Sequence, residues 1–227
     1  MNIKPPGTFF PQPTFLHVFA LLAICTFVQV TSKGVSTMNM VIKERAGLFE
    51  AVLAFILMAK NYQNKGYFSS SLTWINIRTL YGRFHDYIAR VRMFNQDPSK
   101  GQVVVAKKYG LVVGTVSFSF NPDVTPCDKI FPDEMNSLRQ SGQSFVYLGS
   151  FAVSTSYVCT RLSLRMLRAV WNTAKLRGVD LGVCVVHPHH SAFYKRFGFT
   201  EIASSTIPEL DHAPAALLVV KRHAVRL

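Results

Sequence analysis

Residues 181–203, LGVCVVHPHHSAFYKRFGFTEIA, carry a strand–helix–strand pattern. Leu181–Val186 is a compact apolar run that predicts a buried strand. Pro188 suits the first turn of a helix and Gly198 is a residue type that ends one, so the run SAFYKRF between them predicts a short helix. Residues 199–203 predict a second short strand. We therefore expect a sheet whose strands alternate with helices.

The residues around this pattern predict further parts of the same sheet. VVVAKK (103–108) and LVVGTVSFSF (111–120) flank a Tyr109-Gly110 turn, which indicates a β-hairpin. FVYLGSFAV (145–153) predicts a strand, and Gly149 inside it is typical of a bulge or of a close approach by a ligand. Residues 132–140 and 161–175 predict helices, and residues 215–220 predict a last strand. This order predicts a mixed α/β sheet.

The segment before the hairpin is less regular. Residues 48–62, LFEAVLAFILMAKNY, are rich in helix formers and predict a long helix. Residues 66–95 mix aromatic and arginine side chains, and their pattern does not choose between helix and strand. We expect one domain over residues 41–227, preceded by a hydrophobic extension over residues 1–40.

The amino-terminal extension leaves three interpretations open. Residues 15–30, FLHVFALLAICTFVQV, are apolar but shorter than the span of about 20 residues that a membrane helix needs. The stretch lacks the basic start and the small-residue cleavage site of a secretory signal. It is a membrane anchor, a poor signal peptide, or sequence upstream of the true start, for which Met38 and Met40 are candidates. We expect a cytoplasmic protein, with membrane contact through residues 15–30 as the alternative.

The composition indicates a folded protein with negatively charged partners. Hydrophobic residues make up 49% and charged residues 16% of the chain, and the formal net charge is +13. Such a charge favours nucleic acid, anionic lipid, a phosphate-bearing cofactor or an acidic carrier protein without choosing among them. The four cysteines are spread without a CxxC pair, so neither a zinc site nor a disulfide framework is expected.

Two motifs resemble a known family. From Val103 onwards the order of elements resembles the acyltransferases of the GNAT class, and the motifs resemble the FeeM-type N-acyl amino acid synthases. The first motif lies in residues 185–202 and comprises Pro188, His190, Phe193, Tyr194, Arg196, Gly198 and Phe199. The second lies between the hairpin and the central strand and comprises Asp128, Phe131, Pro132, Glu134, Leu138 and Arg139. The resemblance covers residues 100–203 well, residues 42–100 loosely, and the first 40 residues not at all.

The sequence departs from the family pattern at two places. GNAT enzymes commonly hold pyrophosphate with a glycine-rich loop before the long helix, whereas residues 154–163, STSYVCTRLS, contain no glycine. An acyl-carrier protein, which presents a single phosphate, would need less of such a loop. Related synthases often have a glutamate in the central strand as a general base, and Tyr147 occupies the matching position.

The resemblance implies catalytic roles for Tyr194 and His190. Tyr194 matches the position from which GNAT enzymes protonate the leaving thiolate, and the alternative is that it only packs the helix on the sheet. His190, four residues earlier, shares its helix face and is a candidate acceptor for the ammonium proton, with a capping or core role as the alternative. The run HPHH lacks the spacing of a zinc site and has no nearby carboxylate, so no metal is expected.

The central strand and the long helix are the candidate sites for the acyl donor. At the break near Gly149, a backbone N–H of Ser150 or Phe151 would bind the thioester oxygen, and the strand from Gly149 to Val153 would line the donor; an ordinary bulge is the alternative. Arg161 and Arg165, with Arg168, would meet a phosphopantetheine phosphate or an acidic carrier surface. A solvated helix face is the competing interpretation.

The function implied is transfer of an acyl group, expected to be long-chain, from acyl-carrier protein or acyl-CoA to the amine of an amino acid. One alternative is an N-acetyltransferase that uses acetyl-CoA, which the glycine-free loop disfavours. Others are a catalytically inactive module that binds acyl groups or carrier protein, and a basic nucleic-acid-binding module. The last is disfavoured because no nucleic-acid motif accompanies the arginines and aromatics of residues 66–92.

Overall fold

The structure, a computed structural model, describes residues 40–64, 74–157, 161–208 and 212–226. The chain divides after Met38, and the unit that begins at Asn39 holds all the described residues. The expected apolar extension therefore lies almost wholly outside them, as does the segment 15–30. Within the described residues, no helix combines the length and the apolar character needed to cross a membrane.

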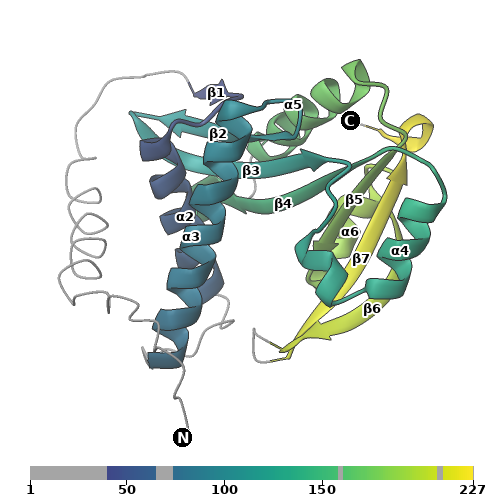
Figure 1. Cartoon of the computed structure of the whole chain (residues 1–227). Helices are drawn as coiled ribbons and strands as arrows, with labels where there is room; N and C mark the ends of the chain where they lie inside the picture. The colour runs from purple at the N-terminus through teal and green to yellow at the C-terminus, as the bar shows by residue number, and fades with distance from the viewer. Residues whose placement is uncertain (1–39, 65–73, 158–160, 209–211, 227) are drawn as a thin grey trace, which may run out of the picture. The chain divides into compact units, whose positions relative to one another are not determined.

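The described residues form one seven-stranded sheet in the order β1-β2-β3-β4-β5-β7-β6 (Figure 1). Only β4 and β5 pair in parallel, and the other neighbours are antiparallel. The strands are β1 Val41–Lys43, β2 Gly101–Lys108, β3 Leu111–Phe120, β4 Phe145–Val153, β5 Leu181–Val186, β6 Thr200–Ile207 and β7 Ala213–Lys221. The predicted mixed sheet is confirmed, and β1 is an addition that the sequence did not predict.

Helices cover both faces of the sheet. They are α2 Leu48–Asn64, α3 Trp74–Gln96, α4 Pro132–Gln140, α5 Leu162–Leu176 and α6 Pro188–Lys195. Helices α2 and α3 pack against Val103 and Val105 of β2, whereas α5 packs against the alternate residues Val104 and Ala106. Because successive side chains of a strand point to opposite faces, α2 and α3 lie on one face and α5 on the other. Helix α6 shares the α5 core and α4 covers the β5–β7 part of the α2 face.

Residues 74–95 of the ambiguous segment lie in the long helix α3, and residues 66–73 lie outside the described residues. Tyr87, Val91 and Phe94 are its buried side chains, spaced by four and three residues along one helix face. Arginines and further aromatics between them hide this spacing in the sequence. The helix is therefore amphipathic and packs its apolar side on β2 and β3.

A buried carboxylate fixes the start of α2. Glu50, which is only 7% exposed, accepts hydrogen bonds from Lys43 Nζ at 2.6 Å, Lys107 Nζ at 2.8 Å and the Gly47 N–H at 2.8 Å. Burial alone would raise the pKa of Glu50, but these three donors outweigh it and lower the pKa from 4.5 to about 2. The carboxylate thus ties α2 to β1 and β2.

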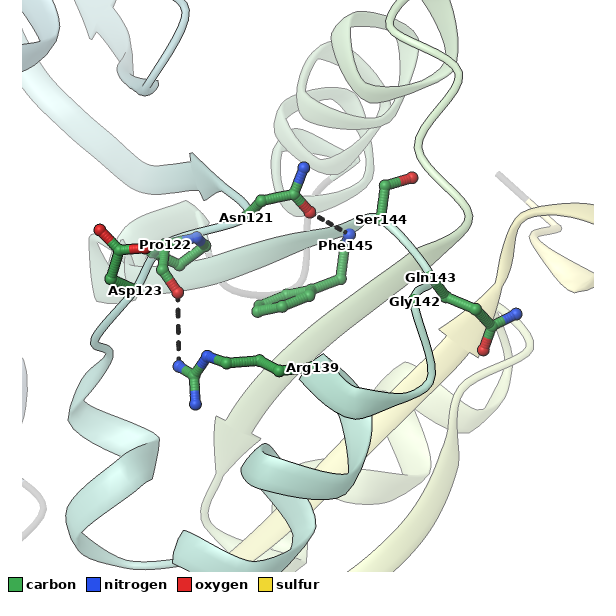
Figure 2. Close-up of a pocket in the computed structure, with 8 residues that line it drawn as sticks. All are labelled: Asn121, Pro122, Asp123, Arg139, Gly142, Gln143, Ser144 and Phe145. Carbon is green, nitrogen blue, oxygen red and sulfur yellow. Dashed lines mark hydrogen bonds between the residues drawn. The ribbon is translucent and has the colours of Figure 1, made fainter.

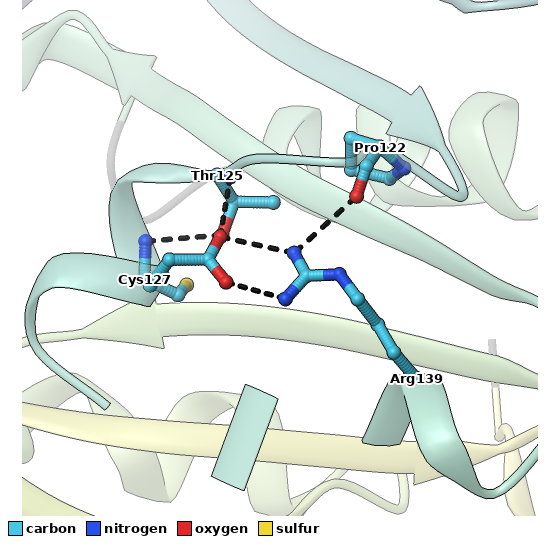
Figure 3. Close-up of polar contacts among 5 residues, drawn as sticks. Pro122, Thr125, Cys127 and Arg139 are labelled. Atoms are coloured by element: carbon cyan, nitrogen blue, oxygen red, sulfur yellow. Dashed lines mark hydrogen bonds and ion pairs between the residues drawn. The ribbon is translucent and has the colours of Figure 1, made fainter. Parts of the chain in front are cut away.

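The connection between β3 and β4 is a compact polar unit (Figure 3). Thr125 caps the short 3-10 helix Pro126–Lys129, and the Asp128 carboxylate accepts from the Thr125 backbone and hydroxyl. Arg139 donates to both carboxylate oxygens of Asp128, and its Nη2 donates to the Pro122 carbonyl at 3.3 Å. These bonds link the 3-10 helix to α4 and hold α4 over the sheet. The Asp128–Arg139 ion pair therefore joins the 3-10 helix to α4, and both segments belong to the motif that resembles the family insert.

Candidate active site

The two parallel strands in the middle of the sheet separate after a short paired stretch. Residues 145–148 of β4 pair with residues 181–184 of β5, and the pairing ends at Leu148 and Cys184. Beyond that point, β4 continues on β3 and β5 continues on β7. The two strands therefore separate from Gly149 onwards, which leaves an opening between them.

A β-bulge lies where the opening begins. Ser117 pairs with Gly149 and Thr115 pairs with Ala152, so Ser150 and Phe151 face the single residue Val116. Ser150 has a φ of +52°, which an L side chain seldom adopts. Such a bulge bends its strand and leaves backbone groups unpaired. The glycine predicted this irregularity, although the positive φ falls on Ser150.

The residues expected to hold the acyl donor are arranged along this bent strand and the helix that follows. Gly149, Ser150 and Phe151 are half-buried at the bulge, and Val153 is buried in the core beside α5. Arg161 is the residue before the first turn of α5, and both it and Arg165 are exposed. Since β4 and β5 are parallel, the starts of α5 and α6 lie at the same end of the sheet as the opening. The structure thus brings these positions to one end of the molecule.

Tyr194 lies inside the apolar layer beneath α6. Its ring packs edge-on against Phe193 at 5.2 Å and Phe199 at 5.5 Å, and the residue is only 6% exposed. Burial raises the pKa of Tyr194 well above its ordinary value, and Cys184 and Tyr62 raise it further. The phenol therefore remains protonated at neutral pH, as a proton donor must.

Tyr62 belongs to α2, on the opposite face of the sheet from α6. Tyr62 makes a small contribution to the raised pKa of Tyr194. Asn61, next to Tyr62, donates from Nδ2 to the Val153 carbonyl at 2.9 Å. The last turn of α2 therefore lies over the end of β4. Asn61 and Tyr62 were not predicted as site residues, and their one signal in the sequence is a pair of polar residues near the end of an apolar helix.

His190 lies one helical turn before Tyr194 on α6 and is half-buried. Its ring stacks near that of His189, with 4.1 Å between centroids, and His189 is in turn 4.4 Å from His187. The His187 ring nitrogen Nδ1 accepts the His189 backbone N–H at 3.3 Å and so caps α6. Among the described residues, no group of His, Cys, Asp and Glu side chains is arranged to hold a metal ion.

Tyr147 occupies the position where related synthases often carry a glutamate. It is 8% exposed and lies in the core between β4 and the α4 unit, near Cys127. Burial raises the pKa of Tyr147 well above its ordinary value, with Cys127 adding to the rise and Arg90 opposing it. A buried neutral phenol does not remove a proton from an ammonium group, so the base must be another residue.

A hollow of about 280 Å³ lies at the other end of β4 (Figure 2). It is lined by residues 121–123, Arg139 and residues 142–145, and Asn121 Oδ1 accepts the Phe145 N–H at 2.6 Å there. Phe145 begins β4 whereas the bulge lies near the end of that strand. The hollow is therefore remote from the opening and is not the reaction centre.

Comparison with known proteins agrees with this geometry. The family profile of the N-acyl amino acid synthase FeeM matches residues 53–221. The solved FeeM structure from uncultured soil microbes is 18% identical, with a TM-score of 0.63 over 82% of this chain and 93% of that one. An N-acetyltransferase from Staphylococcus aureus is 13% identical, with a TM-score of 0.55 over 82% of this chain and 99% of that one.

A further solved structure contains coenzyme A. The PaiA N-acetyltransferase from Thermoplasma acidophilum, solved in complex with coenzyme A, is 10% identical, with a TM-score of 0.52 over 81% of this chain and 99% of that one. No curated protein matches the sequence. The fold is therefore of the GNAT type. The family match then places the chain more closely: it belongs to the FeeM N-acyl amino acid synthase family.

Proposed function

We propose that this acyltransferase moves a long-chain acyl group from acyl-carrier protein or acyl-CoA to the α-amine of an amino acid. The observation that carries the proposal is the opening between β4 and β5, which begins beside the bulge at Ser150 and Phe151. A narrow slot between strands suits an extended pantetheine arm with a thioester at its end. Membership of the FeeM family supports an amino acid as the acceptor.

The bulge would polarise the thioester. A backbone N–H of Ser150 or Phe151, freed from the ladder by the bulge, would donate to the carbonyl oxygen as negative charge develops on it. The amine nitrogen attacks the carbonyl carbon, and the tetrahedral intermediate collapses as the C–S bond breaks. Backbone donors fixed in a strand need no rearrangement during this step.

Tyr194 would protonate the leaving thiolate. Because burial raises the pKa of Tyr194, the phenol still carries its proton when the C–S bond breaks, and this proton would go to the leaving thiolate. Tyr194 lies on α6, which follows β5 at the end of the sheet where β4 and β5 separate. Tyr194 is therefore the proposed general acid.

His190 would accept the proton that the attacking ammonium loses. It lies on the same helix as Tyr194 and one turn closer to the end of β5. An unperturbed imidazole titrates near pH 6.5, which suits proton transfer at neutral pH. Because Tyr147 is buried as a neutral phenol, His190 takes the role that the family glutamate would have.

The donor would bind near the start of α5. Arg161 and Arg165 are exposed there and match a single phosphate or the acidic surface of a carrier protein. The glycine-free sequence before α5 favours the carrier-protein arm over the pyrophosphate of coenzyme A. Solved neighbours that bind coenzyme A keep acyl-CoA as the competing donor.

The proposal is tested by incubating the purified protein with the twenty amino acids and one of three donors: palmitoyl-carrier protein, palmitoyl-CoA or acetyl-CoA. Mass spectrometry should detect an N-palmitoyl amino acid, and Tyr194→Phe should lower the rate of its formation about 100-fold or more. Tyr109→Phe, at the exposed hairpin turn, is the matched control and should keep the wild-type rate.

The outcomes separate the parts of the proposal. A wild-type rate in Tyr194→Phe removes Tyr194 as the acid and leaves the reaction intact. Acetylated products without palmitoylated ones would reassign the protein as an acetyltransferase. A folded wild-type protein that gives no N-acyl product with any donor would refute the function itself.

A further inference from the structure

The sheet face beneath α3 carries a polar patch at the level of the bulge. Strand register places Val105, Thr115 and Ala152 in one row across β2, β3 and β4, and Val103, Ser117 and Gly149 in the next. A third row holds Gly101, Ser119 and Tyr147. Side chains that stand opposite each other in neighbouring strands share a face, so Thr115, Ser117 and Tyr147 all point toward the α2 and α3 side.

Two contacts fix the position of helix α3 along these rows. The hydroxyl of Tyr87 lies close to Thr115, whose proximity lowers the pKa of Tyr87 against the larger effect of burial. Phe94, two turns later, packs on Gly101 so closely that a methyl group there would fall 2.6 Å from its ring. Arg90 lies between these two contacts and is therefore level with the Ser117–Gly149 pair. Its positive charge also opposes the raised pKa of Tyr147, whose side chain lies on this face of the sheet.

Unlike Lys107 and Arg139, the half-buried Arg90 has no carboxylate partner among the described residues. Lys107 is paired with Glu50, and Arg139 is paired with Asp128. In the described part of the chain, the hydrogen bond found for Arg90 runs from Nε to the backbone carbonyl of Asp86 at 3.4 Å. A guanidinium has five N–H donors in a planar fork, so its Nη groups remain available for a bidentate acceptor.

Two buried hydroxyls beside Arg90 also lack partners. Tyr87 is 2% exposed and Thr115 is fully buried, and neither hydroxyl oxygen makes a hydrogen bond of normal geometry within the described residues, although the two side chains lie close together. Unpaired buried polar groups destabilise a fold unless a ligand or water satisfies them. The patch therefore combines an unpaired cation with unsatisfied hydroxyls next to the bulge.

We propose that Arg90 binds the α-carboxylate of the acceptor, so that this face of the sheet is the amino-acid site and Arg90 selects amino acids over simple amines. The inference rests on the proposed function, which supplies the amine. It places the acceptor on the α3 side of the sheet, while α5 and α6 hold the donor groups on the other side. The amine nitrogen of an amino acid lies one carbon from its carboxylate, so a carboxylate held level with Gly149 leaves the nitrogen beside the bulge.

The test compares each amino acid that the wild-type enzyme acylates with the amine made by removing its carboxyl group. Arg90→Gln should lower kcat/KM for the amino acid about tenfold or more, mainly through KM, because it removes a charge-assisted hydrogen bond. It should leave kcat/KM for the decarboxylated amine nearly unchanged. Arg90→Lys keeps the charge and should recover part of the loss. Arg92→Gln, on the exposed side of α3, is the matched control and should behave as wild type.

The result that supports the inference is a loss of preference for the amino acid in Arg90→Gln alone. Equal losses for acid and amine, or an equal effect of Arg92→Gln, would overturn it while leaving acyl transfer established. A wild-type enzyme that acylates amines but no amino acid would also overturn it. A wild-type enzyme without any transferase activity would overturn both this assignment and the proposed function. Circular dichroism of each variant identifies losses that come from unfolding.

Discussion

Replacing Glu50 by glutamine tests how the start of α2 is held over the sheet. The substitution keeps the size of the side chain and one acceptor oxygen, but it removes the charge that Lys43 and Lys107 stabilise. In the native protein the pKa of Glu50 is about 2 rather than 4.5. A difference of about 2.5 units corresponds to about 3 kcal/mol of stability at neutral pH.

The sign of this contribution follows from the direction of the shift. Because folding lowers the pKa of Glu50, its stabilising effect is fully present above about pH 4.5, where the unfolded carboxyl is ionised too. The effect is lost as the pH falls toward 2, where the native carboxylate also takes up a proton. The deficit of Glu50→Gln relative to wild type should therefore shrink by about 2 kcal/mol between pH 7 and pH 3.

Urea denaturation followed by circular dichroism at both pH values measures this deficit. Glu44→Gln is the matched control, since Glu44 is an exposed carboxylate six residues earlier and has no ion pair in the described structure. It should change the free energy of unfolding by less than about 0.5 kcal/mol. A deficit for Glu50→Gln below about 1 kcal/mol at pH 7, or one that is equal at both pH values, would refute the assigned role of the carboxylate.

Gly198→Ala should cost several times the roughly 1 kcal/mol expected of Gly142→Ala in urea denaturation. Both glycines have positive φ, but a methyl group at Gly198 would lie 2.1 Å from the Ala224 carbonyl oxygen, whereas Gly142 has open space around it; equal costs would contradict this. Tyr87→Phe should leave the melting temperature unchanged or raise it, because the buried hydroxyl makes no hydrogen bond of normal geometry among the described residues. A marked fall in the melting temperature would show that the hydroxyl is hydrogen-bonded in the folded protein. Cys127, whose pKa burial raises to about 11, should resist alkylation at pH 8 until the protein is unfolded, as peptide mapping by mass spectrometry would show.

Local sequence predicted the elements with strong periodicity or punctuation. Strands β3, β4 and β5 and helix α4 were predicted at the residues where the structure has them, α5 within one residue and β2 within two. The helix after β5 begins at Pro188, as predicted, and His187 caps it. Strand β1 was missed, since three residues carry no period and their pairing with β2 is a long-range contact.

Local sequence likewise indicated only some residues of the candidate site, because the others come together through long-range contacts. Gly149 indicated an irregular strand, and the resemblance directed attention to Tyr194 and His190. The approach of Asn61 and Tyr62 from α2, and the level of Arg90 above the bulge, depend on how separate helices cross the sheet. Such crossings are set by packing between residues far apart in the chain, which no local pattern records.

The paired stretch of β4 and β5 also has a mechanical consequence. In the described sheet, four residue pairs of β4 and β5 join strands β1–β4 to strands β5–β7. The sheet therefore has two parts that are connected by a short stretch of backbone pairing. A ligand bound between the two parts of the sheet would contact both and restrict their relative motion. Amide hydrogens near the ends of β4 and β5 should then exchange more slowly when the donor is bound, even where the donor does not touch them.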